Sequence, residues 1–149
     1  LWLTLFRDKI DEIMEQVKCP VAVFVNRQYR EGTTVSFVLG GMIDLFLFSY
    51  LDKMLQNGHS VRLFLFDTDD EEFRGRIDDL QVRYPEQTMI VWFEGVEDLV
   101  TEEKDGLLIM SHLSYTKLSE DEAVMRELSS LLVIRRNKNT GDKNEGLEN

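Results

Sequence analysis

Cysteine, histidine and proline are scarce in this 149-residue chain, which has one Cys, two His and two Pro. One cysteine excludes an internal disulfide and a cysteine-based zinc site, and two histidines exclude a histidine-rich metal site. This usage fits a reducing compartment, so we expect a cytoplasmic protein. Cys19 precedes Pro20 at the start of an apolar run without a Lys, Arg or His cluster beside it, and we expect a buried, unreactive thiol.

Basic residues are also few: 17 Lys and Arg against 28 Asp and Glu give a formal net charge of −11. Affinity for nucleic acid comes mostly from Lys and Arg side chains that displace counterions from phosphates. Direct binding of DNA or RNA by this chain is therefore not expected.

The chain lacks a long uninterrupted hydrophobic run. Its longest apolar stretch, 35–51, contains the charged residue Asp44 and the pair Gly40-Gly41, whereas a bilayer span needs about 20 predominantly apolar residues. We interpret the stretch as a buried core element and expect no contact with a membrane. The first residue, Leu1, is not followed by a signal-peptide pattern, and we expect a domain excised from a larger protein.

The pattern of apolar residues predicts alternating helices and strands. Steps of three and four predict an amphipathic helix within 1–19 and another within 73–82. Short apolar runs predict strands buried on both faces at 21–25, 61–66, 89–93 and 107–110. The high density of apolar residues over 35–55 predicts a buried helix, and the alternative is a strand at 35–39. Ser119-Glu120-Asp121-Glu122 matches a helix-capping box, and residues 131–134 either extend that helix or form a fifth strand.

This alternation is typical of βαβ units with right-handed crossovers. We predict one α/β domain over 1–134, a Rossmann-like three-layer sandwich around a sheet of four or five mainly parallel strands. Residues 135–149 are polar, and we predict a disordered tail there.

Two polar segments follow predicted strands, where open α/β sheets bind ligands. In the first, Arg27, Arg30, Thr33 and Thr34 could bind an anion at a helix N-terminus. No glycine motif for nucleotide binding accompanies them, and we favour a plain surface loop.

The second segment contains Asp67, Asp69 and Asp70. Carboxylate oxygens are the ligands that Mg²⁺ prefers, and a metal there could position a phosphate. The simpler interpretation, which we favour, is that Asp67 or Asp69 caps a helix whose first turn is acidic.

Ser111 and His112 follow the fourth predicted strand, but the side chains of sequence neighbours usually diverge, so a nucleophile–base pair is not implied. No Asp or Glu can be assigned to orient His112, and we expect structural roles for His112 and His59. We assign no catalytic residue, and the cofactor remains unknown.

The chain resembles the EIIB-like domain of sugar phosphotransferase systems in two features. One is the order of helices and strands that begins at Pro20-Val21-Ala22-Val23-Phe24-Val25. The other is the late segment Asp105-Gly106-Leu107-Leu108-Ile109-Met110-Ser111. More particularly, the chain resembles the version found at the C-terminus of Mga-type transcription regulators, and the resemblance covers residues 20 to about 134. Phosphotransfer EIIB domains carry a cysteine just after the first strand, where this chain has Asn26-Arg27. The resemblance therefore implies an EIIB-like fold without phosphocysteine chemistry, in a regulatory or dimerising module.

We expect a non-catalytic regulatory or dimerisation domain of a larger bacterial transcription regulator. Its expected partners are other domains of the same polypeptide and a second copy in a homodimer. The alternative is a metal-dependent enzyme domain that acts on a phosphorylated or nucleotide ligand through Asp67, Asp69 and Asp70. A third possibility is a plain scaffold subunit.

Overall fold

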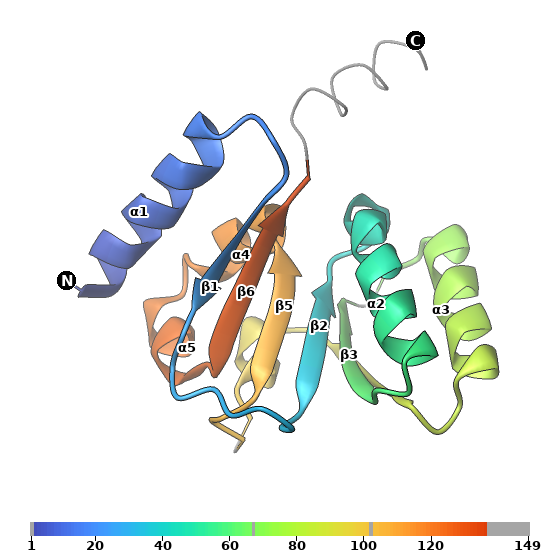
Figure 1. Ribbon diagram of the computed structural model, residues 1–149. Helices are drawn as coiled ribbons and strands as arrows, with labels where there is room; N and C mark the ends of the chain where they lie inside the picture. The colour runs from blue at the N-terminus through green and yellow to red at the C-terminus, as the bar shows by residue number, and fades with distance from the viewer. Residues whose placement is uncertain (1, 67, 102, 137–149) are drawn as a thin grey trace, which may run out of the picture.

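The centre of the molecule is a six-stranded sheet (Figure 1). The computed structural model describes residues 2–66, 68–101 and 103–136, with residues 2–8 described by their backbone alone. The strands are β1 (Val21–Val25), β2 (Val35–Leu39), β3 (Val61–Phe66), β4 (Thr88–Phe93), β5 (Leu107–Ser111) and β6 (Ser130–Arg135). Their order is β1-β6-β5-β2-β3-β4, with β1 antiparallel to β6 and the other neighbours parallel.

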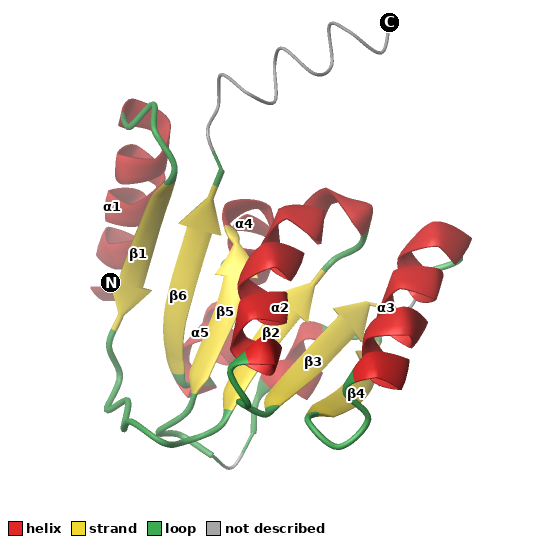
Figure 2. Cartoon of the chain, turned by 45° about the vertical axis from the view of Figure 1, so that its right-hand side comes forward, coloured by secondary structure: helices red, strands yellow, loops and turns green. Residues whose placement is uncertain are grey.

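Helices pack on both faces of this sheet (Figures 1 and 2). The helical segments are α1 (Trp2–Gln16), η1 (Met42–Leu47), α2 (Phe48–Gln56), α3 (Glu71–Arg83), η2 (Val96–Leu99), α4 (His112–Leu118) and α5 (Glu122–Glu127). One core contains α2 and α3, with Leu51 and Phe73 packed in the same cluster as Leu63. The other contains α1, α4 and α5, with Met14 and Tyr115 in one cluster. The predicted α/β class is confirmed, but the sheet has six strands rather than four or five.

The first predicted strand forms, but the prediction that it is buried on both faces was wrong. β1 is an antiparallel edge strand, in which Val25 is buried and Phe24 is 48% exposed. The five consecutive apolar residues of β1 resemble those of a central strand, because neither sequence alternates between apolar and polar residues. Cys19, in the turn before β1, is exposed rather than buried.

The predicted helix over 35–55 is in part a strand, so the alternative at 35–39 was right. β2 lies between β3 and β5 and is buried on both faces, which explains its unbroken apolar run. Gly40 and Gly41 then separate β2 from η1, which leads into α2.

The predicted capping box at Ser119 was also wrong. Ser119 ends α4, a helix that the sequence pattern did not predict. The cap of α5 is Asp121, whose carboxylate accepts a hydrogen bond from the amide of Val124. Residues 131–134 lie in β6, so they form a strand rather than extend a helix.

The direction of the strand order changes at β2. From β2 the chain moves outward to β3 and β4, then returns to the other side of β2 to form β5 and β6. The carboxyl ends of β2 and β5 therefore flank a topological switch point, where doubly wound sheets bind ligands. No helix in the described residues is long and apolar enough to cross a membrane.

Candidate functional site

A buried carboxylate lies at the switch point. Asp44, at the start of η1, has no exposed surface. Its Oδ2 accepts a hydrogen bond from the Gly40 amide at 2.6 Å and one from Ser114 Oγ at 3.2 Å. The Ser114 amide in turn donates to Ser111 Oγ at 3.1 Å. Asp44 therefore joins the end of β2 to the first turn of α4, which follows β5.

Two glycines make this arrangement possible. Gly41 has φ 130° and ψ −159°, a backbone conformation that side chains strongly disfavour. At Gly40, a Cβ atom would lie 3.2 Å from Asp44 Oδ2, so the carboxylate approaches the backbone more closely than other residues readily permit. The glycine pair thus turns the chain and brings Asp44 back onto the end of β2.

The second oxygen of Asp44 has no hydrogen-bond partner among the described residues. This oxygen, Oδ1, is buried. In the described residues, the buried Nε and Nη1 atoms of Arg135 also have no hydrogen-bond partner. Burial of a carboxylate oxygen without a donor or a cation costs several kcal/mol by order of magnitude. Among the described residues, Asp44 is the acidic side chain that has a buried oxygen without a hydrogen-bond partner.

A histidine–carboxylate pair lies on the same edge of the sheet. His112 Nε2 lies 2.9 Å from Asp11 Oδ1, and both side chains are partly exposed. The pair joins α4 to α1, and the imidazole stacks on the Tyr115 ring. No local sequence pattern indicates this partner of His112, because Asp11 and His112 are 101 positions apart. Ser111 does not complete a catalytic pair with His112, since its hydroxyl caps α4.

The loop predicted to bind an anion, which contains Arg27, Arg30, Thr33 and Thr34, lies at the opposite edge of the sheet. Because β1 is antiparallel, the segment that follows it reaches the amino ends of β2 and β3. The Arg27 guanidinium donates to the main-chain oxygens of Met125 and Leu128, and its amide donates to Ser130 Oγ at 2.7 Å. Burial lowers the pKa of the Arg27 guanidinium. These contacts anchor the loop against the segment between α5 and β6.

Arg30, Thr33 and Thr34 contact the segment before β5. Arg30 forms an ion pair with Asp105 at 2.7 Å, and Thr33 Oγ1 donates to the Asp105 main-chain oxygen at 2.9 Å. The main-chain oxygen of Thr34 accepts a hydrogen bond from the Leu107 amide. The four predicted anion ligands therefore share one loop, but the guanidinium groups of Arg27 and Arg30 bind different protein partners.

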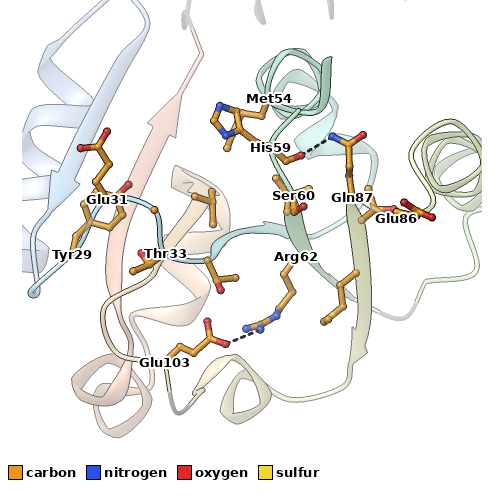
Figure 3. A pocket seen from close by; sticks show the side chains of 16 residues that line it. Tyr29, Glu31, Thr33, Met54, His59, Ser60, Arg62, Glu86, Gln87 and Glu103 are labelled. Atoms are coloured by element: carbon orange, nitrogen blue, oxygen red, sulfur yellow. Dashed lines mark hydrogen bonds and ion pairs between the residues drawn. The ribbon is translucent and has the colours of Figure 1, made fainter. Parts of the chain in front are cut away.

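An open groove of about 970 Å³ runs along this amino edge. Figure 3 shows Arg62 bound to Glu103 across it, with 3.3 Å between Nη2 and Oε1, and Gln87 donating to the main-chain oxygen of His59. Hydrogen bonds from Thr34 and Arg62 lower the pKa of Glu103. The groove thus holds one guanidinium that is already paired, and it does not resemble a site for an anion.

The acidic segment after β3 contains a helix cap. Asp70 accepts hydrogen bonds from the amides of Glu72 and Phe73, at 3.0 and 3.1 Å. The cap is therefore Asp70, rather than Asp67 or Asp69 as predicted. Asp67 lies outside the described residues, so the predicted metal site that includes it stays a prediction. Among the residues that the structure does describe, no three His, Cys, Asp or Glu side chains are grouped to hold a metal.

The sheet also has an apolar face that no helix covers. Ala22 and Phe24 of β1 lie opposite Ile134 and Leu132 of β6, and cross-strand partners share a face. Leu132 and Ile134 belong to the cluster on the α2 and α3 side of the sheet. Figure 1 shows α2 and α3 at the right, beside β2 and β3, with no helix in front of β1 and β6. We call this surface the open face.

The open face is bordered by η1 and by the residue after β6. The guanidinium of Arg136 lies 5.9 Å from the ring centre of Phe46, so these two segments lie close together. Ile43 of η1 is 54% exposed beside them. The strand residues on this side are all uncharged. Ala22 and Phe24 are exposed and Leu107 and Leu132 are partly buried, whereas Ile109 and Ile134 are buried beneath them.

No protein-family model, curated protein or solved structure matches this chain.

Proposed function

We propose that this chain is a cytoplasmic, non-catalytic regulatory domain of a larger bacterial transcription regulator, and that it dimerises through the open face. The observation that carries the proposal is the exposure of Phe24, 48% of whose surface is accessible on an otherwise apolar part of the sheet. In α/β proteins both faces of a largely parallel sheet are normally covered. A further layer over β1 and β6 would complete this one.

Charge favours a second copy of the chain as that layer. The chain has a net charge of −11, so most of its surface repels an identical molecule. The strands of the open face present no charged side chain. Two copies can therefore meet there without placing carboxylates opposite one another. A basic partner would find no carboxylate on these strands to attract it.

The polar groups considered for catalysis have structural partners, which supports a non-catalytic role. Ser111 and Asp70 cap helices, and His112 binds the carboxylate of Asp11. The resemblance to the EIIB-like domain of Mga-type regulators supports the assignment to transcription regulation. DNA would then be bound by other domains of the polypeptide, because this chain is strongly acidic.

Molar mass in solution tests the proposal. We expect light scattering to give twice the chain mass of 17.4 kDa for the wild type. Phe24→Glu should give the mass of one chain, because it would place two carboxylates in an apolar interface. Val82→Glu is the matched control, since Val82 is 78% exposed on α3, away from the open face, and its substitution should leave the dimer intact.

A wild type that remains a monomer at all concentrations would contradict the dimer, as would a Phe24→Glu variant with an unchanged mass. The metal-dependent enzyme alternative has less support, because the Asp70 carboxylate that it requires already accepts two backbone amides.

A further inference from the structure

We infer that the free edge of β4 binds an extended, basic segment of a partner protein as an additional strand of the sheet. This site is independent of the open face, because β1 and β4 are the strands at opposite ends of the sheet. The only strand that pairs with β4 in the described residues is β3, and the sheet ends at β4 (Figure 2). Edge strands present unpaired main-chain groups, and extended peptide segments commonly bind by pairing with them.

The hydrogen bonds between β3 and β4 identify the main-chain groups that are free. The Val61 amide donates to the main-chain oxygen of Gln87 at 2.8 Å. Alternate residues of a parallel strand direct their main-chain groups toward the same neighbour, so those of Met89 also point to β3. The N–H and C=O groups of Ile90 and Trp92 therefore point outward. Among the main-chain hydrogen bonds outside helices and strands of the described residues, none involves Ile90 or Trp92.

The edge of β4 carries none of the usual protection against pairing. Natural edge strands are commonly blocked by a charged residue, a proline or a bulge. The segment Thr88–Phe93 contains no charged residue, no proline and no glycine. Met89 is 59% exposed and Trp92 is 41% exposed, and they lie on opposite faces of the sheet. An added strand would therefore find free main-chain groups with an accessible apolar side chain on each side of them.

The charges that flank β4 decide between partners. Glu86 and Glu94 are both exposed, one on each side of the strand. If a second copy paired antiparallel along the whole of β4, with Ile90 opposite Ile90, each Glu86 would lie near a Glu94 of the other copy. Like charges that face each other across an antiparallel pair destabilise it. An uncharged segment with Lys or Arg at both ends would instead place a cation beside each carboxylate.

The groove at the amino edge continues the same surface. Glu86 and Met89 line this groove, so it begins where β4 begins. Figure 3 shows Glu86 at one side of the groove and Glu31 at the other, with Glu103 bound to Arg62 between them. The volume of about 970 Å³ is at the upper end of the range for ligand pockets. A basic segment that extends past the start of β4 would meet further carboxylates there.

Fluorescence anisotropy with two dye-labelled synthetic peptides tests the charge requirement. Both alternate Val and Thr over the length of β4, and one has Lys at both ends while the other has Glu. We expect the wild type to bind the Lys peptide about tenfold more tightly or better. Glu86→Lys combined with Glu94→Lys should reverse this preference. Glu12→Lys combined with Glu120→Lys changes the net charge equally at exposed sites away from β4 and should retain it.

Ile90→Pro tests the strand pairing, because it removes the N–H that points outward. Edge strands accept proline at such positions, so the variant should fold and bind the Lys peptide about tenfold more weakly or worse. Ile90→Val keeps the N–H and should bind like the wild type.

Hydrogen exchange locates the added strand in the wild type, without a variant that could fail to fold. The Lys peptide should slow exchange at the amides of Ile90 and Trp92, whereas the Met89 amide, which points to β3, should not change. Three results would each overturn the inference: no binding of the Lys peptide at millimolar concentration, unchanged exchange at Ile90 and Trp92, or equal effects of the two pairs of Glu→Lys substitutions.

Discussion

Phe24 lies directly opposite Leu132 in the antiparallel ladder of β1 and β6, so both side chains project from the same face of the sheet. Because β1 forms the edge and no helix lies over it on this side, Phe24 is half exposed while Leu132 is partly buried. The pair lies on the open face, at the edge of the sheet.

The unfolding midpoint of the wild type should rise with protein concentration. Dimerisation stabilises the folded chain by mass action, and a tenfold increase in concentration should raise the midpoint by roughly 3 °C. Phe24→Glu should give a midpoint that does not depend on concentration, while Val82→Glu should retain the dependence. Calorimetry over two decades of concentration checks this, and the same slope in all three proteins would contradict it.

The cap of α3 should be worth about 1 kcal/mol, the usual loss when a capping Asp becomes Ala. Asp70→Ala should lower the free energy of unfolding by that amount, because two amides of the first turn lose their acceptor. Asp69→Ala changes the neighbouring carboxylate without removing the cap and should have little effect. Urea unfolding measures both, and a larger loss in Asp69→Ala would count against the assignment of the cap.

Two glycine substitutions should have opposite effects on stability. A Cβ at Gly106 would lie 2.8 Å from the main-chain oxygen of Thr34, which also accepts the Leu107 amide. Gly106→Ala should therefore destabilise the fold by about 1 to 3 kcal/mol. Gly75 lies within α3 with open space around it, so Gly75→Ala should stabilise by about 0.5 to 1 kcal/mol. Urea unfolding measures both: no loss of stability in Gly106→Ala would contradict the packing at Gly106, and a loss in Gly75→Ala would contradict the open space at Gly75.

Glu103 should contribute to the loss of stability in acid. Its pKa is lowered in the folded state by hydrogen bonds from Thr34 and Arg62. A lowered folded pKa gives stabilisation that is present above the ordinary value of 4.5 and is lost as the pH falls through the folded value. Glu103→Gln should therefore lose less stability than the wild type when the pH falls below 4.5. Urea unfolding at several pH values checks this, and equal losses would show that Glu103 has no such role.

Much of the fold follows from local patterns. The apolar runs at β3, β4 and β5 predict strands because these runs are short and bounded by turn residues, and the spacing in α1 and α3 predicts helices. The pattern failed for β1, since an apolar run does not say whether both sides of a strand are covered. It also failed at β2, where a buried strand followed directly by buried helical turns resembles one long helix.

The candidate site was less predictable because it is assembled from distant segments. Asp11 and His112 meet only because α1 and α4 pack on the same face of the sheet. Asp44 did have a local signal, as the single charge within the apolar stretch 35–51. Its contact with Ser114, 70 positions away, depends on the strand order, which the sequence pattern does not specify.

The most direct test of the open face as the dimer interface uses the only cysteine. Cys19 is exposed and lies just before β1, so a spin label on its sulfur sits beside the open face. Pulsed dipolar spectroscopy of the labelled wild type should show one narrow distribution of distances between the labels of two chains. Labelled Phe24→Glu should show none, and labelled Val82→Glu should match the wild type. The absence of a defined distance in the wild type, or its persistence in Phe24→Glu, would contradict the account.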